Sequence, residues 1–271
     1  MEVKQEYITE RFEVEGFAAT VILPPKPNGK WLWKTEFFYA FDTLERELCA
    51  RGYTRVYYAV SDRYGSPKSI ELMYKFYREL LRRYPFLNEK GYIIGFSRGG
   101  MYAFNFTIAH PECVKKAYFD APVLDLRTWP RKEEQFGERR LREQVAREYG
   151  FASDYEYETY DKYPVDCFDA YFRLKIPTLL VAGDADKVVD FSANSQKMIN
   201  YCIKNNIEGF RYYVKHGADH HPHSFGNVSG EDCERAEVYS SEIAGSSLEH
   251  LCKVENDEKI LIPFFEDENN E

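Results

Sequence analysis

The sequence predicts an α/β protein with a mostly parallel central sheet and helices on both of its faces. Short apolar runs of strand length alternate with amphipathic runs of helix length, which is the arrangement of parallel strands joined by helices. The chain has 271 residues, of which 44% are hydrophobic, and this is enough to bury one sizeable core. One large domain built around such a sheet is therefore expected.

The first half of the chain supplies these elements in order. Alternating runs at 8–14 and 17–23 predict two antiparallel strands at the edge of the sheet, turned at Glu15-Gly16. A Pro-rich break leads to a short third strand at 30–34. Helical periodicity at 37–51 stops at Gly52, a residue type that suits a helix C-terminus. A buried strand follows at 56–60, then a loop at 61–67 and a helix that ends at about residue 84. The next strand lies at 92–94, and a second helix follows at 98–109.

The second half continues the alternation around one exception. Strands at 117–119, 178–182 and 210–214 and a helix at 191–204 keep the pattern. The stretch 123–175 is charged, rich in Arg, Glu and Tyr, and helical in parts, so it predicts a helical cap inserted above the carboxyl ends of the strands. The expected domain is 1–225 with this cap inside it.

Residues 226–271 form a predicted carboxyl-terminal extension. Its first part favours a weakly amphipathic helix at best, and the apolar run ILIPFF predicts an extra edge strand. The final EDENNE predicts a disordered acidic tail.

Charge and cysteine usage exclude several classes of protein. The 36 Lys and Arg against 45 Asp and Glu leave a net charge of −9, which disfavours nucleic acid and anionic membrane surfaces as partners. No apolar run reaches the length of a membrane span, and the charged beginning of the chain lacks a signal peptide, so a cytoplasmic location is expected. The 6 cysteines are scattered singly and are expected to be reduced thiols. No oligomeric state is indicated.

The sharpest motif is GFSRG at 95–99, which lies between a predicted buried strand and a predicted helix. A turn this tight strains the backbone of Ser97 and lifts its hydroxyl above the sheet, while the flanking glycines remove side chains that would clash. The helix N-terminus that follows directs free N–H groups at any oxyanion formed there. The motif predicts a nucleophilic serine.

A serine nucleophile needs a base and an acid that orients the base. Three aspartates follow later strands and compete for the role of acid, namely Asp120, Asp184 and Asp186. Four histidines follow the last predicted core strand and compete for the role of base: His216, His220, His221 and His223.

The chain resembles α/β-hydrolase-fold serine hydrolases, of the branch that includes prolyl-oligopeptidase-like enzymes and carbohydrate esterases. The resemblance covers about residues 8–225 and rests on GFSRG, on the GxxDxxV pattern at 183–189 and on the GxxH pattern at 217–220. It implies Ser97 as nucleophile, Asp186 as acid and His220 as base, in an enzyme without a cofactor. No metal is expected either, because the glycine and proline among the histidines favour a loop rather than the helix on which an HxxxH pair binds an ion, and no glutamate follows as in HExxH.

The oxyanion hole needs two N–H donors, and Arg98, directly after the nucleophile, is expected to supply one. The resemblance places the second in the loop 34–37, where WKTEFF lacks the glycines of the family's HGGG form. Glu36 or Thr35 is the expected donor. The Glu36 carboxylate would then orient substrate hydroxyls or face the positive end of the following helix.

Further residues are expected to face the same crevice. Asp62 and Tyr64, after a sheet strand, are candidates for binding a sugar, although Asp, Gly, Ser and Pro in that loop also favour a plain turn. Trp129 is a candidate for lining the pocket or for the cap's own core. His223 is a candidate for contacting substrate or for capping the turn.

These observations predict a serine esterase. The resemblance to carbohydrate esterases implies a small-molecule or glycan ester as substrate, an acetyl or methyl ester of a carbohydrate. The 22 Tyr, 20 Phe and 3 Trp agree with it, since aromatic rings can stack on sugars. A prolyl-oligopeptidase-like peptidase is the first alternative, although no propeller domain precedes the hydrolase domain. The second is a non-catalytic or metal-binding domain, since His and Asp clusters bind Zn²⁺.

Overall fold

A ten-stranded sheet runs through the computed structural model, which describes residues 6–130, 138–221, 223–225, 235–242, 245–255 and 259–268. The strands lie in the order β1-β2-β4-β3-β5-β6-β7-β8-β9-β10. β3 to β8 are mutually parallel, and antiparallel pairs flank them at both ends of the sheet. The strands are β1 (Ile8–Val14), β2 (Phe17–Leu23), β3 (Trp31–Lys34), β4 (Thr54–Tyr58), β5 (Gly91–Phe96), β6 (Val114–Asp120), β7 (Thr178–Gly183), β8 (Phe210–Lys215), β9 (Arg235–Ser240) and β10 (Cys252–Glu255).

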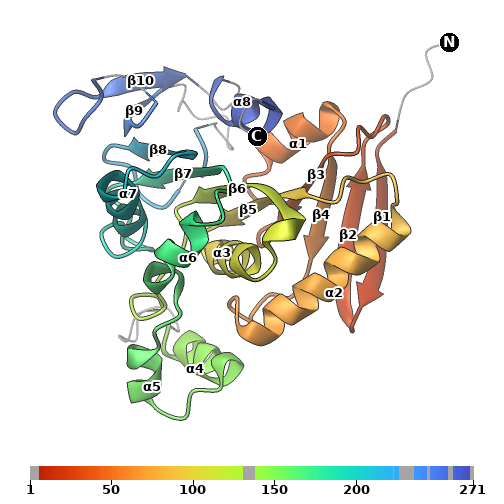
Figure 1. Cartoon of the computed structure of the whole chain (residues 1–271), viewed down its shortest axis with the longest axis horizontal. Helices are drawn as coiled ribbons and strands as arrows, with labels where there is room; N and C mark the ends of the chain where they lie inside the picture. The colour runs from red at the N-terminus through yellow and green to blue at the C-terminus, as the bar shows by residue number, and fades with distance from the viewer. Residues whose placement is uncertain are drawn as a thin grey trace.

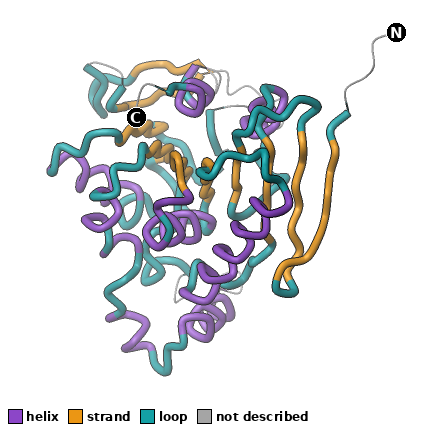
Figure 2. The backbone as a smooth tube through the Cα atoms, turned by 45° about the vertical axis from the view of Figure 1, so that its right-hand side comes forward, coloured by secondary structure: helices purple, strands orange, loops and turns teal. Residues whose placement is uncertain are grey.

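Helices cover both faces of the sheet, as the alternation of strands and helices predicted (Figures 1 and 2). One apolar cluster joins α2, α3, α6 and α7 to one face, and a second joins α1 and α8 to the other. The helices are α1 (Thr43–Ala50), α2 (Pro67–Arg83), α3 (Gly99–Ala109), α4 (Glu138–Tyr149), α5 (Asp154–Thr159), α6 (Phe168–Phe172), α7 (Ser195–Lys204) and α8 (Leu261–Glu266), with short 3₁₀ turns at Pro111–Cys113 and Pro164–Asp166.

The central strand β5 shows why the sequence forms this architecture. All of its residues are buried, and successive side chains point to opposite faces of a strand. Ile93 joins the cluster beneath α2 and α3, whereas Ile94 and Phe96 join the cluster beneath α1 and α8. A continuous apolar run is therefore required where both faces of a parallel sheet are covered.

Helix α1 is shorter than the sequence periodicity indicated. It begins at Thr43 rather than at residue 37, and the preceding segment is a loop. Phe37 and Phe41 have φ values of 57° and 52°, a backbone conformation that helices do not contain. The aromatic spacing of this segment resembles a helix, but it belongs to a loop beside the amino-terminal end of α3.

The segment 226–271 differs from its prediction in two places. Residues 235–255 contribute β9 and β10 instead of a helix, and β9 pairs with β8. ILIPFF is not an edge strand, because it contributes α8 instead. The four apolar side chains of α8 that are buried lie at 261, 262, 264 and 265, a spacing that puts them on one helical stripe. Of the predicted acidic tail, residues 269–271 lie outside the described residues.

The predicted cap contributes α4, α5 and α6 to the structure, with α4 and α5 projecting away from the sheet (Figure 1). Residues 131–137 of the segment lie outside the described residues. Tyrosine and phenylalanine rings pack inside it, at Tyr149, Phe151, Tyr157, Tyr160 and Tyr163. Among the described residues, no helix has the length and apolar character needed to cross a membrane.

Candidate active site

Ser97 stands at the turn between β5 and α3. Its φ is 49°, so the backbone is in the left-handed region that costs energy for any residue with a side chain. The turn is held because the Ser97 N–H donates to the Asp120 carbonyl on β6, at 3.0 Å. A Cβ on Gly95 would lie 2.9 Å from the Ala103 Cβ, so a glycine is required where the strand passes beneath the helix.

Ser97, His220 and Asp186 form a continuous chain of hydrogen bonds. His220 Nε2 lies 3.0 Å from Ser97 Oγ, and His220 Nδ1 lies 2.7 Å from Asp186 Oδ2. The side chains of His220 and Asp186 are 4% and 2% exposed, so water does not compete for the bond between them. The arrangement can transfer a proton from the serine to an imidazole that is fixed by a carboxylate.

Hydrogen bonds within and between two loops fix the positions of Asp186 and His220. Asp186 Oδ1 accepts the N–H groups of Val188 and Val189, both at 2.8 Å, which leaves Oδ2 directed at His220. Asp219 Oδ1 accepts the N–H groups of Lys187 and His220, also at 2.8 Å, and so ties the loop after β8 to the loop after β7.

The competing residues Asp184 and His216 pair with each other instead. His216 Nδ1 lies 2.9 Å from Asp184 Oδ2, and Asp184 Oδ1 accepts the Gly217 N–H. Neither side chain contacts His220 or Ser97. Their bond joins the carboxyl ends of β7 and β8, which is a structural function.

The backbone beside Ser97 presents N–H groups that have no hydrogen-bond partner among the described residues. The Thr35 N–H donates to the Ile94 carbonyl at 3.0 Å, which removes Thr35 as an oxyanion donor. Within the part of the chain that the structure describes, the N–H groups of Glu36 and Arg98 make no hydrogen bond. Gly99 allows the two segments to approach, because a Cβ there would lie 2.9 Å from Thr35 Oγ1 and 3.2 Å from the Glu36 Cβ.

The Glu36 carboxylate is buried beside the same turn. Its Oε2 accepts hydrogen bonds from Ser61 Oγ at 3.0 Å and from Arg98 Nη2 at 3.3 Å, and its Oε1 has no partner among the described residues. Burial raises the pKa of Glu36, although Arg98 and Ser61 oppose the shift. Asp62 lies on the solvent side with its side chain 63% exposed, and its Oδ1 accepts from Arg98 Nη1 at 3.2 Å.

A second histidine–aspartate pair lies directly beneath the site. His223 Nδ1 lies 2.8 Å from Asp120 Oδ1, and both side chains are at most 2% exposed. Asp120 Oδ2 also accepts from the Tyr118 hydroxyl and the Ser224 N–H, each at 2.6 Å. Burial alone would raise the pKa of Asp120, but His223, Lys215 and these hydrogen bonds lower it to about 2. Asp120 is thus committed to His223, and His223 is enclosed rather than directed at substrate.

Tyr64 also differs from its predicted substrate contact. Its side chain is 1% exposed, and its hydroxyl donates to Gln144 Oε1 on α4 at 2.7 Å. Trp129 packs near it, with ring centroids 6.5 Å apart. Tyr64 therefore connects the loop after β4 to the cap. Its burial could not be predicted from the sequence of that loop.

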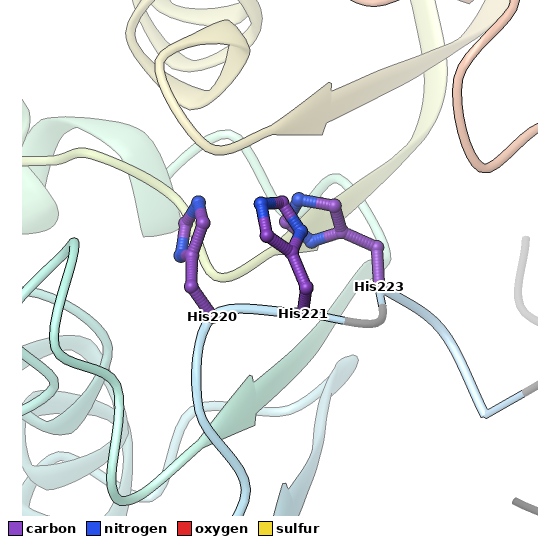
Figure 3. Close-up of side chains that lie close together, drawn as sticks. All are labelled: His220, His221 and His223. Atoms are coloured by element: carbon purple, nitrogen blue, oxygen red, sulfur yellow. The ribbon is translucent and has the colours of Figure 1, made fainter.

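Three histidine rings gather at the base of the site (Figure 3). The ring centroids of His220, His221 and His223 are 4.7 to 5.0 Å apart. One ring nitrogen from each lies within 4.8 Å of the others. His221 is the exposed member and stacks on Phe41, with centroids 4.9 Å apart. Partial desolvation of its ring and the two neighbouring histidines lower its pKa.

Two exposed aromatic side chains on the loop after Glu36 were not singled out from the sequence. Phe37 and Tyr39 are 37% and 60% exposed, and the Arg98 guanidinium carbon lies 5.4 Å from the Phe37 ring. They belong to the loop that the sequence periodicity assigned to a helix. Correct placement of that loop would have pointed to them.

Residues 56–244 match the prolyl oligopeptidase family. No curated protein matches the chain in sequence. Among solved structures, the S-formylglutathione hydrolase FrmB of Staphylococcus aureus is similar, with a TM-score of 0.59, 15% identity and coverage of 80% of this chain and 92% of that one. The fluorophosphonate-binding serine hydrolase FphF of Staphylococcus aureus is similar as well, with a TM-score of 0.61, 16% identity and coverage of 80% of this chain and 92% of that one.

A puromycin-hydrolysing peptidase of Mycobacterium tuberculosis is also similar. It gives a TM-score of 0.61 and 17% identity, with coverage of 80% of this chain but only 36% of the peptidase. These likenesses establish the fold. The chain spans most of the two staphylococcal hydrolases and about a third of the peptidase.

Proposed function

The chain belongs to the prolyl oligopeptidase family and is a serine hydrolase of the α/β-hydrolase fold. We propose that it cleaves carboxylic esters with Ser97, His220 and Asp186. The observation that carries the proposal is the unbroken chain of hydrogen bonds from Asp186 through His220 to Ser97, at 2.7 and 3.0 Å. A chain of this kind activates a serine hydroxyl that is otherwise a weak nucleophile at neutral pH.

The proposed reaction has two steps. Ser97 Oγ attacks the ester carbonyl while His220 Nε2 accepts its proton, and Asp186 stabilises the resulting imidazolium. The N–H groups of Arg98 and Glu36 hold the oxyanion, and both are supported as donors by their lack of other partners among the described residues. The alcohol leaves with the proton from His220. Water activated by His220 then hydrolyses the acyl-enzyme.

The proposed substrate is a carbohydrate ester. Phe37 and Tyr39 support it, since their exposed rings lie on the loop that follows Glu36, and the Phe37 ring lies 5.4 Å from the guanidinium carbon of Arg98. The three tryptophans do not contribute in the same way, because Trp31 and Trp33 are in the core and Trp129 packs near the buried Tyr64.

The nucleophile is tested with p-nitrophenyl acetate and a fluorophosphonate probe on wild type, Ser97→Ala and Ser192→Ala. Ser192 is exposed, and among the described residues its hydroxyl bonds Asp190 alone, so it is the matched serine control. We expect labelling and turnover in wild type and Ser192→Ala and their loss in Ser97→Ala. Equal turnover in all three proteins would contradict the proposal.

The sugar is tested by comparing Tyr39→Ala with wild type on acetylated glycans and on p-nitrophenyl acetate. A stacking ring contributes about 1 kcal/mol, so KM for the glycan should rise about fivefold while the aryl ester is unaffected. An equal effect on both esters would remove the sugar from the proposal.

Peptide hydrolysis is the second candidate, and the family match favours it. Esters and anilides with the same acyl group separate the two reactions, because an amine leaves only after protonation by His220, whereas an alcohol depends less on that proton. A kcat/KM for the anilide that equals the value for the ester would establish a peptidase.

A further inference from the structure

The histidine cluster at the base of the site has the geometry of a metal site. Two of its members carry a buried carboxylate on Nδ1, since Asp186 lies 2.7 Å from His220 and Asp120 lies 2.8 Å from His223. Histidines that bind metals in proteins are held in this way, with one ring nitrogen on a carboxylate and the other on the ion. The nitrogen that remains for an ion on each of these two rings is Nε2.

The spacing of the rings fits one tetrahedral ion. Zn–N bonds of about 2.0–2.1 Å at tetrahedral angles place imidazole centroids about 5 Å apart and their nitrogens about 3.4 Å apart. The observed centroids are 4.7 to 5.0 Å apart, and the nitrogens lie within 4.8 Å of one another. Binding therefore requires side-chain rotations that shorten the longest of these nitrogen–nitrogen distances from 4.8 Å to about 3.4 Å.

His221 completes the set of ligands. It is exposed, makes no hydrogen bond to any described residue, and is positioned by stacking on Phe41. The Asp120 and Asp186 carboxylates supply negative charge behind the other two rings. Imidazole nitrogens with carboxylates behind them suit Zn²⁺ better than Mg²⁺ or Ca²⁺, which take oxygen ligands.

We propose that His220, His221 and His223 bind one Zn²⁺ ion, and that the bound ion reversibly inhibits hydrolysis. The ion occupies the lone pair of His220 Nε2, which lies 3.0 Å from Ser97 Oγ, so the imidazole can no longer accept the serine proton. The site is therefore inhibitory rather than catalytic. Its effect on turnover rests on the proposed function, whereas its binding rests on the histidine geometry alone.

Calorimetric titration with ZnCl₂, run beside p-nitrophenyl acetate hydrolysis, tests the proposal. Wild type should bind one Zn²⁺ per chain and lose turnover with the same dissociation constant, and a chelator should restore activity. MgCl₂ and CaCl₂ should neither bind nor inhibit. His221→Ala should weaken Zn²⁺ binding at least about tenfold. His216→Ala is the matched control, because His216 lies in the same loop but pairs with Asp184, and its affinity should equal that of wild type.

Two further variants separate the possible failures. His223→Asn, checked for folding by circular dichroism, should weaken Zn²⁺ binding like His221→Ala, and Ser97→Ala should bind Zn²⁺ at least as tightly as wild type. A protein that binds no Zn²⁺, that binds it equally well without His221, or that keeps full turnover with Zn²⁺ bound would overturn the proposal. Absence of turnover in the metal-free protein would count against the proposed function, and calorimetry would still test the site.

Discussion

Individual residues around Ser97 divide into two groups by what their side chains contact. One group forms the hydrogen-bond chain of Asp186, His220 and Ser97, and the other supports it from beneath through Asp120 and His223. The rings of His220 and His223 are 5.0 Å apart, so the two pairs are packed against each other. Substitutions in each group should produce different signatures, one in turnover and the other in stability.

Asp186→Asn should lower kcat about 10⁴-fold and leave KM nearly unchanged. The amide holds His220 in the wrong tautomer and does not stabilise the imidazolium. Steady-state kinetics with p-nitrophenyl acetate would measure the loss. Asp184→Asn is the control, because Asp184 bonds His216 and Gly217 and does not touch His220, and it should remain close to wild type. An equal loss in both variants would show that loop distortion, not the tautomer, is responsible.

Asp120 should make the free energy of unfolding depend on pH below about 5. Its folded pKa of about 2 lies below the ordinary 3.8, so its ionisation stabilises the fold above pH 3.8. This contribution, about 2 kcal/mol, is lost as the pH falls through 3.8 towards 2, and about half is gone at pH 3. Urea unfolding of wild type and Asp120→Asn between pH 7 and pH 3 would measure it. Free energies of unfolding that change with pH in the same way in both proteins would contradict the lowered pKa of Asp120.

At the scale of elements, the start of α3 has to approach its neighbours closely. A Cβ on Gly100 would lie 2.4 Å from the Pro122 Cβ, and one on Gly99 would meet Thr35. Because glycine has no Cβ at these positions, the ends of β3 and β6 can approach the start of α3 around Ser97. The pattern of glycines is therefore a consequence of packing as well as of the turn.

Gly100→Ala distinguishes packing from helix propensity. Alanine is about 1 kcal/mol better than glycine inside a helix, so propensity alone predicts a gain in stability. The clash with Pro122 predicts a net loss of about 1–2 kcal/mol instead. Urea unfolding gives the sign directly, and a more stable variant would show that Pro122 can move aside.

At the scale of the whole molecule, α8 closes one face of the sheet with residues from the end of the chain. Lys116 Nζ on β6 donates to the carbonyls of Phe264 and Asp267, and the Tyr53 hydroxyl donates to the Phe265 carbonyl. Burial lowers the pKa of Lys116 to about 8. The helix is short, so its stability depends on these tertiary contacts rather than on its own sequence.

Phe265→Ala should destabilise the protein by about 3–5 kcal/mol, because its side chain is fully buried against Tyr92 and Tyr118. Phe86→Ala is the matched control. Phe86 is 47% exposed, so its loss should cost less than about 1 kcal/mol in the same urea titration. Similar values for both would mean that α8 is not part of the cooperative fold.

Features that depend on neighbours along the chain could be predicted from the sequence. The parallel strands, their helices and the turn at Ser97 follow from local apolar runs and glycines. The order of serine, acid and histidine left three aspartates and four histidines as candidates, and the motifs of the family resemblance selected Asp186 and His220, which lie 2.7 Å apart, with His220 3.0 Å from Ser97.

Features that depend on contacts between distant segments could not be predicted in this way. The Thr35 N–H donates to the Ile94 carbonyl, and the Tyr64 hydroxyl donates to Gln144. His223 pairs with Asp120, 103 residues away in sequence. The helical stripe of α8 became visible only with a sheet face to cover. Local patterns record which groups are available, whereas hydrogen-bond partners and burial are set by packing, and packing is a property of the whole chain.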